Sequence, residues 1–148
     1  MRPRVYFVDE DVSQTWPLRA ELELRGMDVV PFETADDAFE VLVRCEDASV
    51  IIIDVMLAVG SYDHERFSRS RTDMYLETGL AFLEDLVEQR SDLGPRCILL
   101  TNTSKPRTLD KASRLCEKLG ARLWRKPSFS SPMDFGEQVQ GVVDGSLQ

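Results

Sequence analysis

The alternation of short apolar segments rich in β-branched residues with longer segments of helical period is the feature that most limits the fold of this chain. Residues 50–53 and 97–100 are nearly all apolar, as in strands that are buried on both faces of a parallel sheet. The helical segments between strands fit the crossovers that parallel pairing requires. We therefore expect an α/β fold, in which helices cover both faces of a parallel sheet. The strands are predicted at residues 4–8, 28–31, 50–53, 97–100 and 122–124.

Capping residues and apolar stripes predict five helices. Ser13 and Thr34 stand in N-cap positions ahead of the first two, and Gly120 closes the fourth. Pro17 falls inside the first helix and removes a hydrogen bond, so a start of the regular helix nearer Thr15 is the alternative to a start at Ser13. The helices are predicted at residues 13–25, 35–45, 78–89, 106–119 and 133–143.

Length and charge restrict the class of protein. The 148 residues, 43% of them hydrophobic, suffice for one domain with one core. The net charge of −8 argues against a broad electropositive face for nucleic acid. No apolar stretch is long enough for a signal peptide or a membrane span. We expect a soluble, cytoplasmic protein without membrane insertion, in which Cys45, Cys97 and Cys116 are buried thiols and His64 is a surface residue.

Residues 58–77 do not fit the alternation of strands and helices. This polar segment has 20 residues, whereas strand-to-helix loops in such folds usually have about two to six. A solvated loop is one interpretation. Packing on the domain, as a lid or a partner surface, is the other, because disordered segments are poor in aromatic residues. The apolar residues are Tyr62, Phe67, Met74, Tyr75 and Leu76, interleaved with Arg66, Arg69 and Arg71.

Polar side chains follow four of the five predicted strands. Since the carboxyl ends of parallel strands meet at one edge of the sheet, these side chains are expected to share a crevice there. Converging carboxylates repel one another unless a cation compensates, and oxygen ligands with waters describe a Mg²⁺ site. The lysine and the threonine of the set are suited to phosphate oxygens. The set comprises Asp9, Glu10, Asp11, Asp54, Thr101, Asn102 and Lys126.

In these segments the sequence resembles the receiver domains of two-component response regulators. The resemblance covers about residues 4–143 and implies a flavodoxin-like (βα)5 doubly wound sheet with strand order 2-1-3-4-5. It also implies that residues 1–148 form a single receiver domain, with an insertion at about 58–77 and no output domain. The matching segments are VYFVDED (5–11), VIIIDVML (50–57), CILLTN (97–102) and Arg125-Lys126-Pro127.

The resemblance implies that Asp54 is the phosphoacceptor. It would take a phosphoryl group from the phosphohistidine of a sensor histidine kinase or phosphotransfer protein. Glu10 and Asp54 would bind Mg²⁺ directly, with the Met56 backbone carbonyl as third ligand and Asp9 acting through water. Self-phosphorylation from small phosphodonors and autodephosphorylation are expected, rather than conventional enzyme turnover.

The same resemblance assigns the phosphate-binding groups. Thr101 and Lys126 would hold the phosphoryl oxygens, and the peptide bond before Pro127 would be cis. Asn102 stands where the family favours a small residue. We expect it to narrow the access of water and so to alter the lifetime of the phosphoryl group.

The coupled switch of the family is altered in this sequence. Leu123 stands where the family usually has Tyr or Phe, and the neighbouring Trp124 is a possible substitute. Phosphorylation would bias the surface of the fourth helix, fifth strand and fifth helix toward a downstream protein or a second copy. The candidate contact residues are Lys111, Arg114, Lys118, Arg122 and Trp124.

The sequence is also compatible with two other functions. One is a degenerate receiver that serves as a non-catalytic interaction or dimerisation module. The other is a haloacid-dehalogenase-like phosphohydrolase, because residues 9–13 (DEDVS) resemble its DxDx[TS] motif. This second reading lacks the acidic pair expected after Lys126 and leaves Asp54 unexplained.

Overall fold

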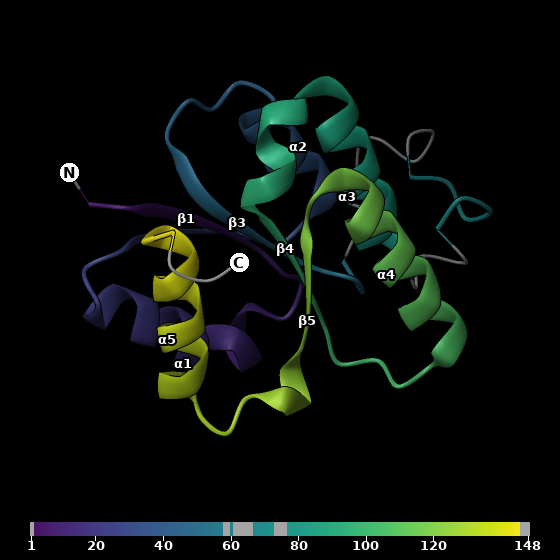
Figure 1. Ribbon diagram of the computed structural model, residues 1–148. Helices are drawn as coiled ribbons and strands as arrows, with labels where there is room; N and C mark the ends of the chain where they lie inside the picture. The colour runs from purple at the N-terminus through teal and green to yellow at the C-terminus, as the bar shows by residue number, and fades with distance from the viewer. Residues whose placement is uncertain (1, 58–59, 61–66, 73–76, 146–148) are drawn as a thin grey trace.

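Five parallel strands form a single sheet in the order β2-β1-β3-β4-β5 (Figure 1). The computed structural model describes residues 2–57, 60, 67–72 and 77–145. The predicted fold class and strand order are therefore confirmed, and each strand begins and ends within about two residues of its predicted range. The strands are β1 (Arg4–Val8), β2 (Asp28–Phe32), β3 (Ala48–Asp54), β4 (Cys97–Thr101) and β5 (Arg122–Arg125).

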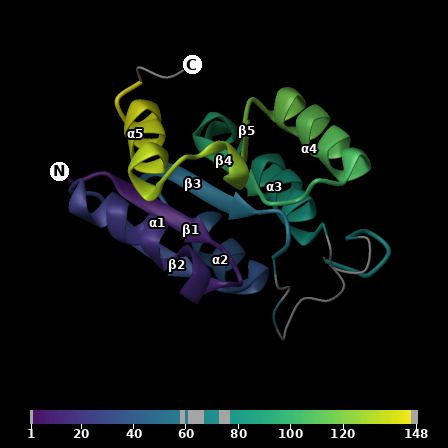
Figure 2. The ribbon, with the colours of Figure 1, turned by 90° about the horizontal axis from the view of Figure 1, so that it is seen from below.

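Helices cover both faces of the sheet (Figure 2). On one face lie α1 (Val12–Leu24) and α5 (Pro132–Val143). On the other face lie α2 (Ala35–Leu42), α3 (Thr78–Gln89) and α4 (Pro106–Leu119). Two short 3₁₀ helices, η1 (Ser91–Arg96) and η2 (Lys126–Ser128), lie before β4 and after β5. No helix among the described residues is long and apolar enough to span a membrane.

The position of β3 at the centre of the sheet explains why its sequence is apolar without alternation. Ile51 and Ile53 pack into the core beneath α2, α3 and α4, whereas Val50 and Ile52 pack into the core beneath α1 and α5. Successive side chains of a strand point to opposite faces. Because helices cover both faces here, each position from Val50 to Ile53 is apolar, and Asp54 ends the strand.

The first helix differs from its prediction. It begins at Val12, and its cap is Asp11, whose side chain accepts a hydrogen bond from the Gln14 backbone N–H. Ser13 therefore lies inside the helix, and Pro17 is a residue of its interior. The predicted caps of two later helices are confirmed, because Thr34 caps α2 and Gly120 ends α4 with a left-handed φ of +76°. Helix α2 ends at Leu42, three residues before its predicted end.

Part of the long segment between β3 and α3 packs on the domain. Phe67 is fully buried, with its ring centroid 6.4 Å from those of Phe39 in α2 and Phe82 in α3. Arg71 donates hydrogen bonds to Asp85 and Glu84 of α3. Over residues 67–72 the packed interpretation is thus confirmed. His64, Arg66 and the other predicted apolar residues of the segment (Tyr62, Met74, Tyr75 and Leu76) lie outside the described residues.

Candidate functional site

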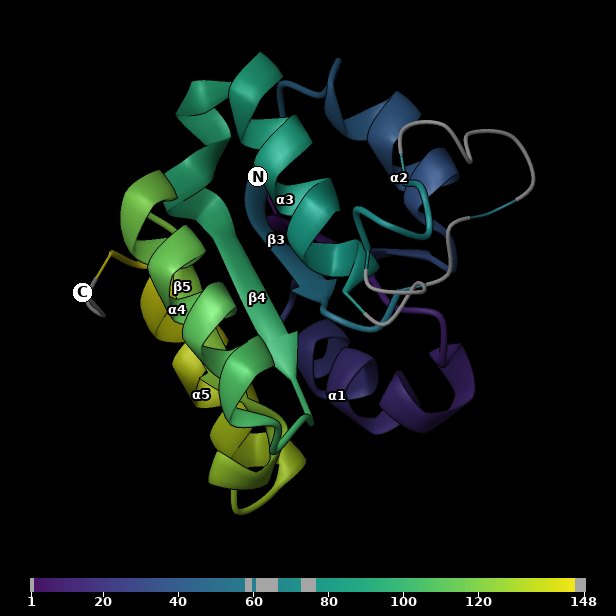
Figure 3. The same cartoon turned by 90° about the vertical axis from the view of Figure 1, so that its right-hand side faces the viewer.

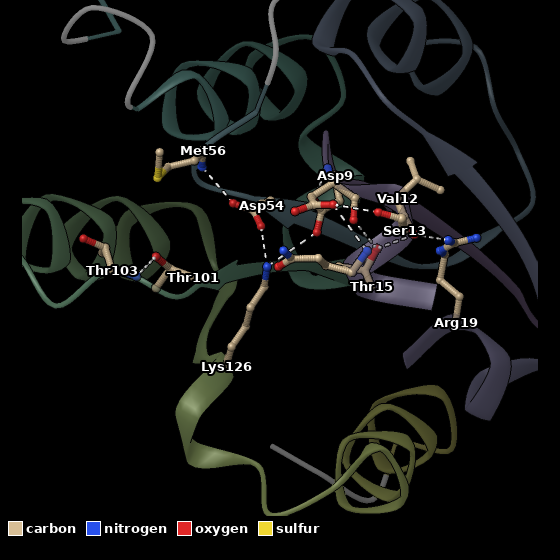
Figure 4. Close-up of polar contacts among 12 residues, drawn as sticks. Asp9, Val12, Ser13, Thr15, Arg19, Asp54, Met56, Thr101, Thr103 and Lys126 are labelled. Atoms are coloured by element: carbon tan, nitrogen blue, oxygen red, sulfur yellow. Dashed lines mark hydrogen bonds and ion pairs between the residues drawn. The ribbon is translucent and has the colours of Figure 1, made fainter. Parts of the chain in front are cut away.

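The carboxyl ends of four neighbouring strands bring the predicted site residues to one edge of the sheet (Figure 4). Asp9 follows β1, Asp54 is the last residue of β3, Thr101 is the last of β4 and Lys126 follows β5. The strand order places β3 between β1 and β4, so Asp54 is central. Ligand sites of open parallel sheets lie in this position.

Asp54 is held from two sides. Its Oδ2 accepts a hydrogen bond of 2.7 Å from Lys126 Nζ, and its Oδ1 accepts one of 2.8 Å from the Met56 backbone N–H. Only 7% of the residue is exposed. Burial by itself lowers the pKa of Lys126, but the Asp54 and Asp9 carboxylates outweigh burial and raise it. Lys126 therefore remains an ammonium group.

Asp9 is the least satisfied group of the site. Its Oδ1 accepts from the Asp11 backbone N–H at 2.8 Å, but its Oδ2 is buried without a hydrogen-bond partner, 3.5 Å from Lys126 Nζ. Burial, and next the charge of Asp54, raise the pKa of Asp9 to about 6. One ammonium group thus faces two carboxylates, and a further proton or cation would balance the charge.

The donor set fits Mg²⁺ when the ion retains water. Mg²⁺ is usually bound through one or two carboxylates with several waters. The unpartnered Asp9 Oδ2 beside Asp54 supplies such a pair. Glu10 is exposed, and the described residues contain no group of three or more His, Cys, Asp and Glu side chains that could hold a metal. The two aspartates are accordingly the core of the candidate metal site.

Thr101 lies beside these carboxylates on β4. It is 1% exposed, and its hydroxyl oxygen accepts a hydrogen bond of 3.0 Å from the Thr103 backbone N–H. Since the oxygen accepts in this turn, the hydroxyl proton can be given to another oxygen. Asn102, the next residue, is exposed.

Comparisons with solved structures place the fold. A CheY-like response regulator receiver domain protein from Methanospirillum hungatei is 22% identical, with a TM-score of 0.70 over 99% of this chain and 97% of that one. The receiver domain of a signal transduction histidine kinase from Syntrophus aciditrophicus is 21% identical, with a TM-score of 0.69 over 97% and 91%. The chain has the receiver-domain fold.

A third match of the receiver fold is a response regulator protein from Burkholderia pseudomallei. Its structure contains a phosphorylated aspartic acid, a calcium ion and citrate. It is 20% identical, with a TM-score of 0.63 over 95% of this chain and 66% of that one. The sequence itself matches no protein-family model and no curated protein.

One prediction from the receiver resemblance is wrong. The described residues contain no cis peptide bond, so the bond between Lys126 and Pro127 is trans. Pro127 lies at the start of η2, where its fixed φ suits a tight turn and its missing N–H is not needed. The Phe129 N–H closes this turn onto the Lys126 carbonyl at 3.2 Å.

Trp124 and Leu123, the two predicted switch residues, lie on opposite sides of the sheet. Leu123 packs against the core beneath α2, α3 and α4, whereas Trp124 packs against Phe129 and Phe135 on the α5 side. Thr101 shares the face of Leu99, which belongs to the Leu123 side. Trp124 is therefore not placed to replace an aromatic residue at position 123.

Two further residues, Gly79 and Glu77, lie near the site, and the sequence pattern predicts no role for them. The Gly79 N–H donates to the Val55 carbonyl at 2.8 Å, and a Cβ on Gly79 would lie 2.0 Å from the Asp54 carbonyl oxygen. Glu77 is buried and bound by Thr108 and Lys111 of α4. These contacts join residues far apart in the sequence, so no local pattern indicates them.

Proposed function

We propose that Asp54 accepts a phosphoryl group from a histidine kinase or phosphotransfer protein. The observation that carries this proposal is the position of Asp54, a buried carboxylate at the centre of the sheet edge, between Lys126 Nζ and the Met56 N–H and next to Asp9. The phosphorylated aspartate in the Burkholderia pseudomallei protein of the same fold supports it.

The chemistry is a transfer between two nucleophiles. A carboxylate oxygen of Asp54 attacks the phosphorus of a phosphohistidine, and the new P–O bond forms as the P–N bond breaks. The electron pair of the P–N bond passes to the imidazole nitrogen of the donor. Lys126 compensates the negative charge of the phosphoryl oxygens, and the Thr101 hydroxyl donates to one of them.

Mg²⁺ is the cofactor that these side chains favour. Asp9 and Asp54 would hold it, with Glu10 and the Met56 carbonyl as further candidate ligands. When bound, Mg²⁺ neutralises charge on the transferring phosphoryl group. The unpartnered Asp9 oxygen supports this assignment, because a buried acceptor without a donor is uncommon.

The proposed output is a contact with another protein or a second copy. A phosphoryl group adds roughly −1.5 to −2 charges at the sheet edge. The neighbouring α4–β5 region is basic in an acidic chain, because residues 96–126 carry nine Lys or Arg and two Asp or Glu. The exposed α4 residues Lys111, Arg114 and Lys118 favour an acidic partner surface.

The second candidate function is an interaction module that does not accept phosphate. The packing of Trp124 away from Thr101 favours it, since the aromatic part of the switch is missing. The phosphohydrolase interpretation has less support, because the matched structures share the receiver fold and the geometry makes Asp54, not Asp9, the central carboxylate.

Intact-mass measurement after incubation with Mg²⁺ and acetyl phosphate separates these functions. The wild-type protein should gain one phosphoryl group, and Asp54→Ala should gain none. Asp28→Asn is the matched control, because Asp28 lies at the opposite end of the sheet and pairs with Arg4. No gain by the wild-type protein, whether from acetyl phosphate or from a phosphorylated histidine donor, would favour the interaction module.

The same assay tests the expected role of Asn102. Asn102→Ala should change the rate at which the phosphoryl group is lost, because the exposed Asn102 follows Thr101 at the site. An unchanged rate would refute this role without affecting the assignment of Asp54.

A further inference from the structure

Glu77 forms a buried link between the start of α3 and the first turns of α4. Its Oε2 accepts a hydrogen bond of 2.9 Å from the Thr108 hydroxyl, and its Oε1 accepts one of 2.8 Å from Lys111 Nζ. The Glu77 side chain is 5% exposed. Figure 3 shows α3 and α4 side by side. We call Glu77, Thr108 and Lys111 together the Glu77 clasp.

The clasp depends on a carboxylate that stays charged. Burial raises the pKa of Glu77, but the Lys111 and Thr108 hydrogen bonds outweigh burial and lower it. Both carboxylate oxygens are bound by α4. A shift of α4 along α3 would leave a buried charge without partners, which is strongly unfavourable. The clasp therefore stabilises one position of α4 relative to α3.

Both helices that the clasp joins, α3 and α4, are connected to the candidate site. On the α3 side, the Gly79 N–H bonds to the carbonyl of Val55, the residue after Asp54. On the α4 side, four residues connect Thr101 to Pro106, and hydrogen bonds tie them into successive turns. The Thr103 N–H donates to the Thr101 hydroxyl, and the Lys105 N–H donates to the Thr103 hydroxyl.

We propose that Glu77 is a positioning residue that holds α4, and through residues 102–105 the Thr101 hydroxyl, in the arrangement that precedes phosphorylation. This inference rests on the proposed function. A phosphoryl group on Asp54 that draws Thr101 toward itself must loosen the clasp. Loosening also releases Lys111, 45% exposed, to the basic face of α4. The clasp thus sets how readily Asp54 is phosphorylated and joins that event to the partner surface.

The test compares Glu77→Gln with Glu84→Gln. Both positions line the same cleft of about 200 Å³ between α3 and α4, but Glu84 pairs with Arg71 rather than with a residue of α4. We expect Glu77→Gln to speed amide hydrogen exchange in the first turns of α4 at least tenfold. It should also speed phosphoryl gain from acetyl phosphate at least about threefold, because the competent arrangement becomes more populated. Glu84→Gln should change neither.

Thr108 provides a second pair of variants that does not alter Glu77. Thr108→Val removes the hydroxyl at nearly constant size and should behave like Glu77→Gln. Thr108→Ser keeps the hydroxyl and should restore the slow exchange and the slow phosphoryl gain. This pair decides the question if Glu77→Gln does not fold.

Two results overturn the inference. If Glu77→Gln and Thr108→Val lower the stability but leave the rate of phosphoryl gain as in Glu84→Gln, the clasp is structural only. If their amide exchange in α4 equals that of the wild type, the clasp does not hold α4. Failure of the proposed function is recognised separately, because the wild-type protein then gains no phosphoryl group while the amide exchange still measures the clasp.

Discussion

The ammonium group of Lys126 lies 2.7 Å from Asp54 Oδ2 and 3.5 Å from Asp9 Oδ2, so one cation is shared by two buried carboxylates. The closer contact is with Asp54, and Asp9 is left with a raised pKa and with an oxygen that accepts no hydrogen bond. Charge compensation at this edge of the sheet is therefore incomplete, and the stability of the protein should respond to changes in any of the three groups.

Lys126→Met should destabilise the protein at pH 7. The change leaves Asp54 and Asp9 without their cation, at a cost of about 1–3 kcal/mol in the free energy of unfolding. Urea unfolding at pH 7 and pH 5 measures the effect. The loss should shrink at pH 5, because Asp9 then takes up a proton. An equal loss at both pH values would show that Lys126 acts through packing alone.

The contribution of Asp9 to the stability of the metal-free protein should fall as the pH rises from about 4 to about 6. The pKa of Asp9 is raised from 3.8 to about 6 in the folded protein, so in this range the folded state binds more protons than the unfolded state. Asp9→Asn lacks the carboxylate and should gain stability relative to the wild type as the pH rises.

Urea unfolding in the presence of a chelator, at pH 4.5 and pH 7, tests this pH dependence. The comparison of Asp9→Asn with the wild type isolates Asp9 from other carboxylates such as Glu77, whose pKa is lowered and whose effect has the opposite sign. Asp28→Asn is again the control, and its difference from the wild type should not follow the Asp9 pattern. A pH-independent difference for Asp9→Asn contradicts the prediction.

The residues around Asp54 can be predicted from the sequence, because each follows a recognisable strand and the sheet topology brings the strand ends together. Lys126 and Asp54 are 72 residues apart, but both follow strands of one parallel sheet, and such strands end at a common edge. The strand topology does not predict the contacts of Glu77. Its partners lie 31 and 34 residues away on a helix, and which face of α4 meets α3 depends on packing that the sequence pattern does not specify.

Gly79→Ala should destabilise the protein strongly. The added Cβ would lie 2.0 Å from the Asp54 carbonyl oxygen and 2.7 Å from Val55 Cα, both backbone atoms that cannot turn away. We expect a loss of about 3 kcal/mol or more, because the first turn of α3 must move off β3. The loss of phosphoryl acceptance at Asp54 should accompany it.

Gly26→Ala is the matched control for this substitution. Gly26 has a left-handed φ of +86°, but a Cβ there meets nothing within 4 Å. Its cost should be limited to backbone strain of about 1–2 kcal/mol. Thermal or urea unfolding distinguishes the two variants, and equal losses would mean that the close approach to Asp54 is relieved by a small shift.

The start of α1 shows what the local sequence pattern does not predict. Ser13 and Asp11 are both good N-cap residues two positions apart, and the sequence pattern does not separate them. The turn after β1 decides, because the Asp11 N–H binds Asp9 Oδ1 and leaves the Asp11 side chain at the helix start. Apolar strands such as β4 were located more closely, because burial on both faces leaves a continuous signal.

Phe67→Ala should show that the segment before α3 is part of the packed domain. Phe67 is fully buried against Phe39 and Phe82, and removal of such a ring costs about 3–5 kcal/mol. Phe67→Leu should cost less, since it retains part of the apolar volume. Arg69→Ala, at an exposed position of the same segment, should change the free energy of unfolding by no more than about 0.5 kcal/mol. Urea unfolding of the three variants orders them, and a Phe67→Ala protein as stable as Arg69→Ala would mean that the ring contributes nothing to the core.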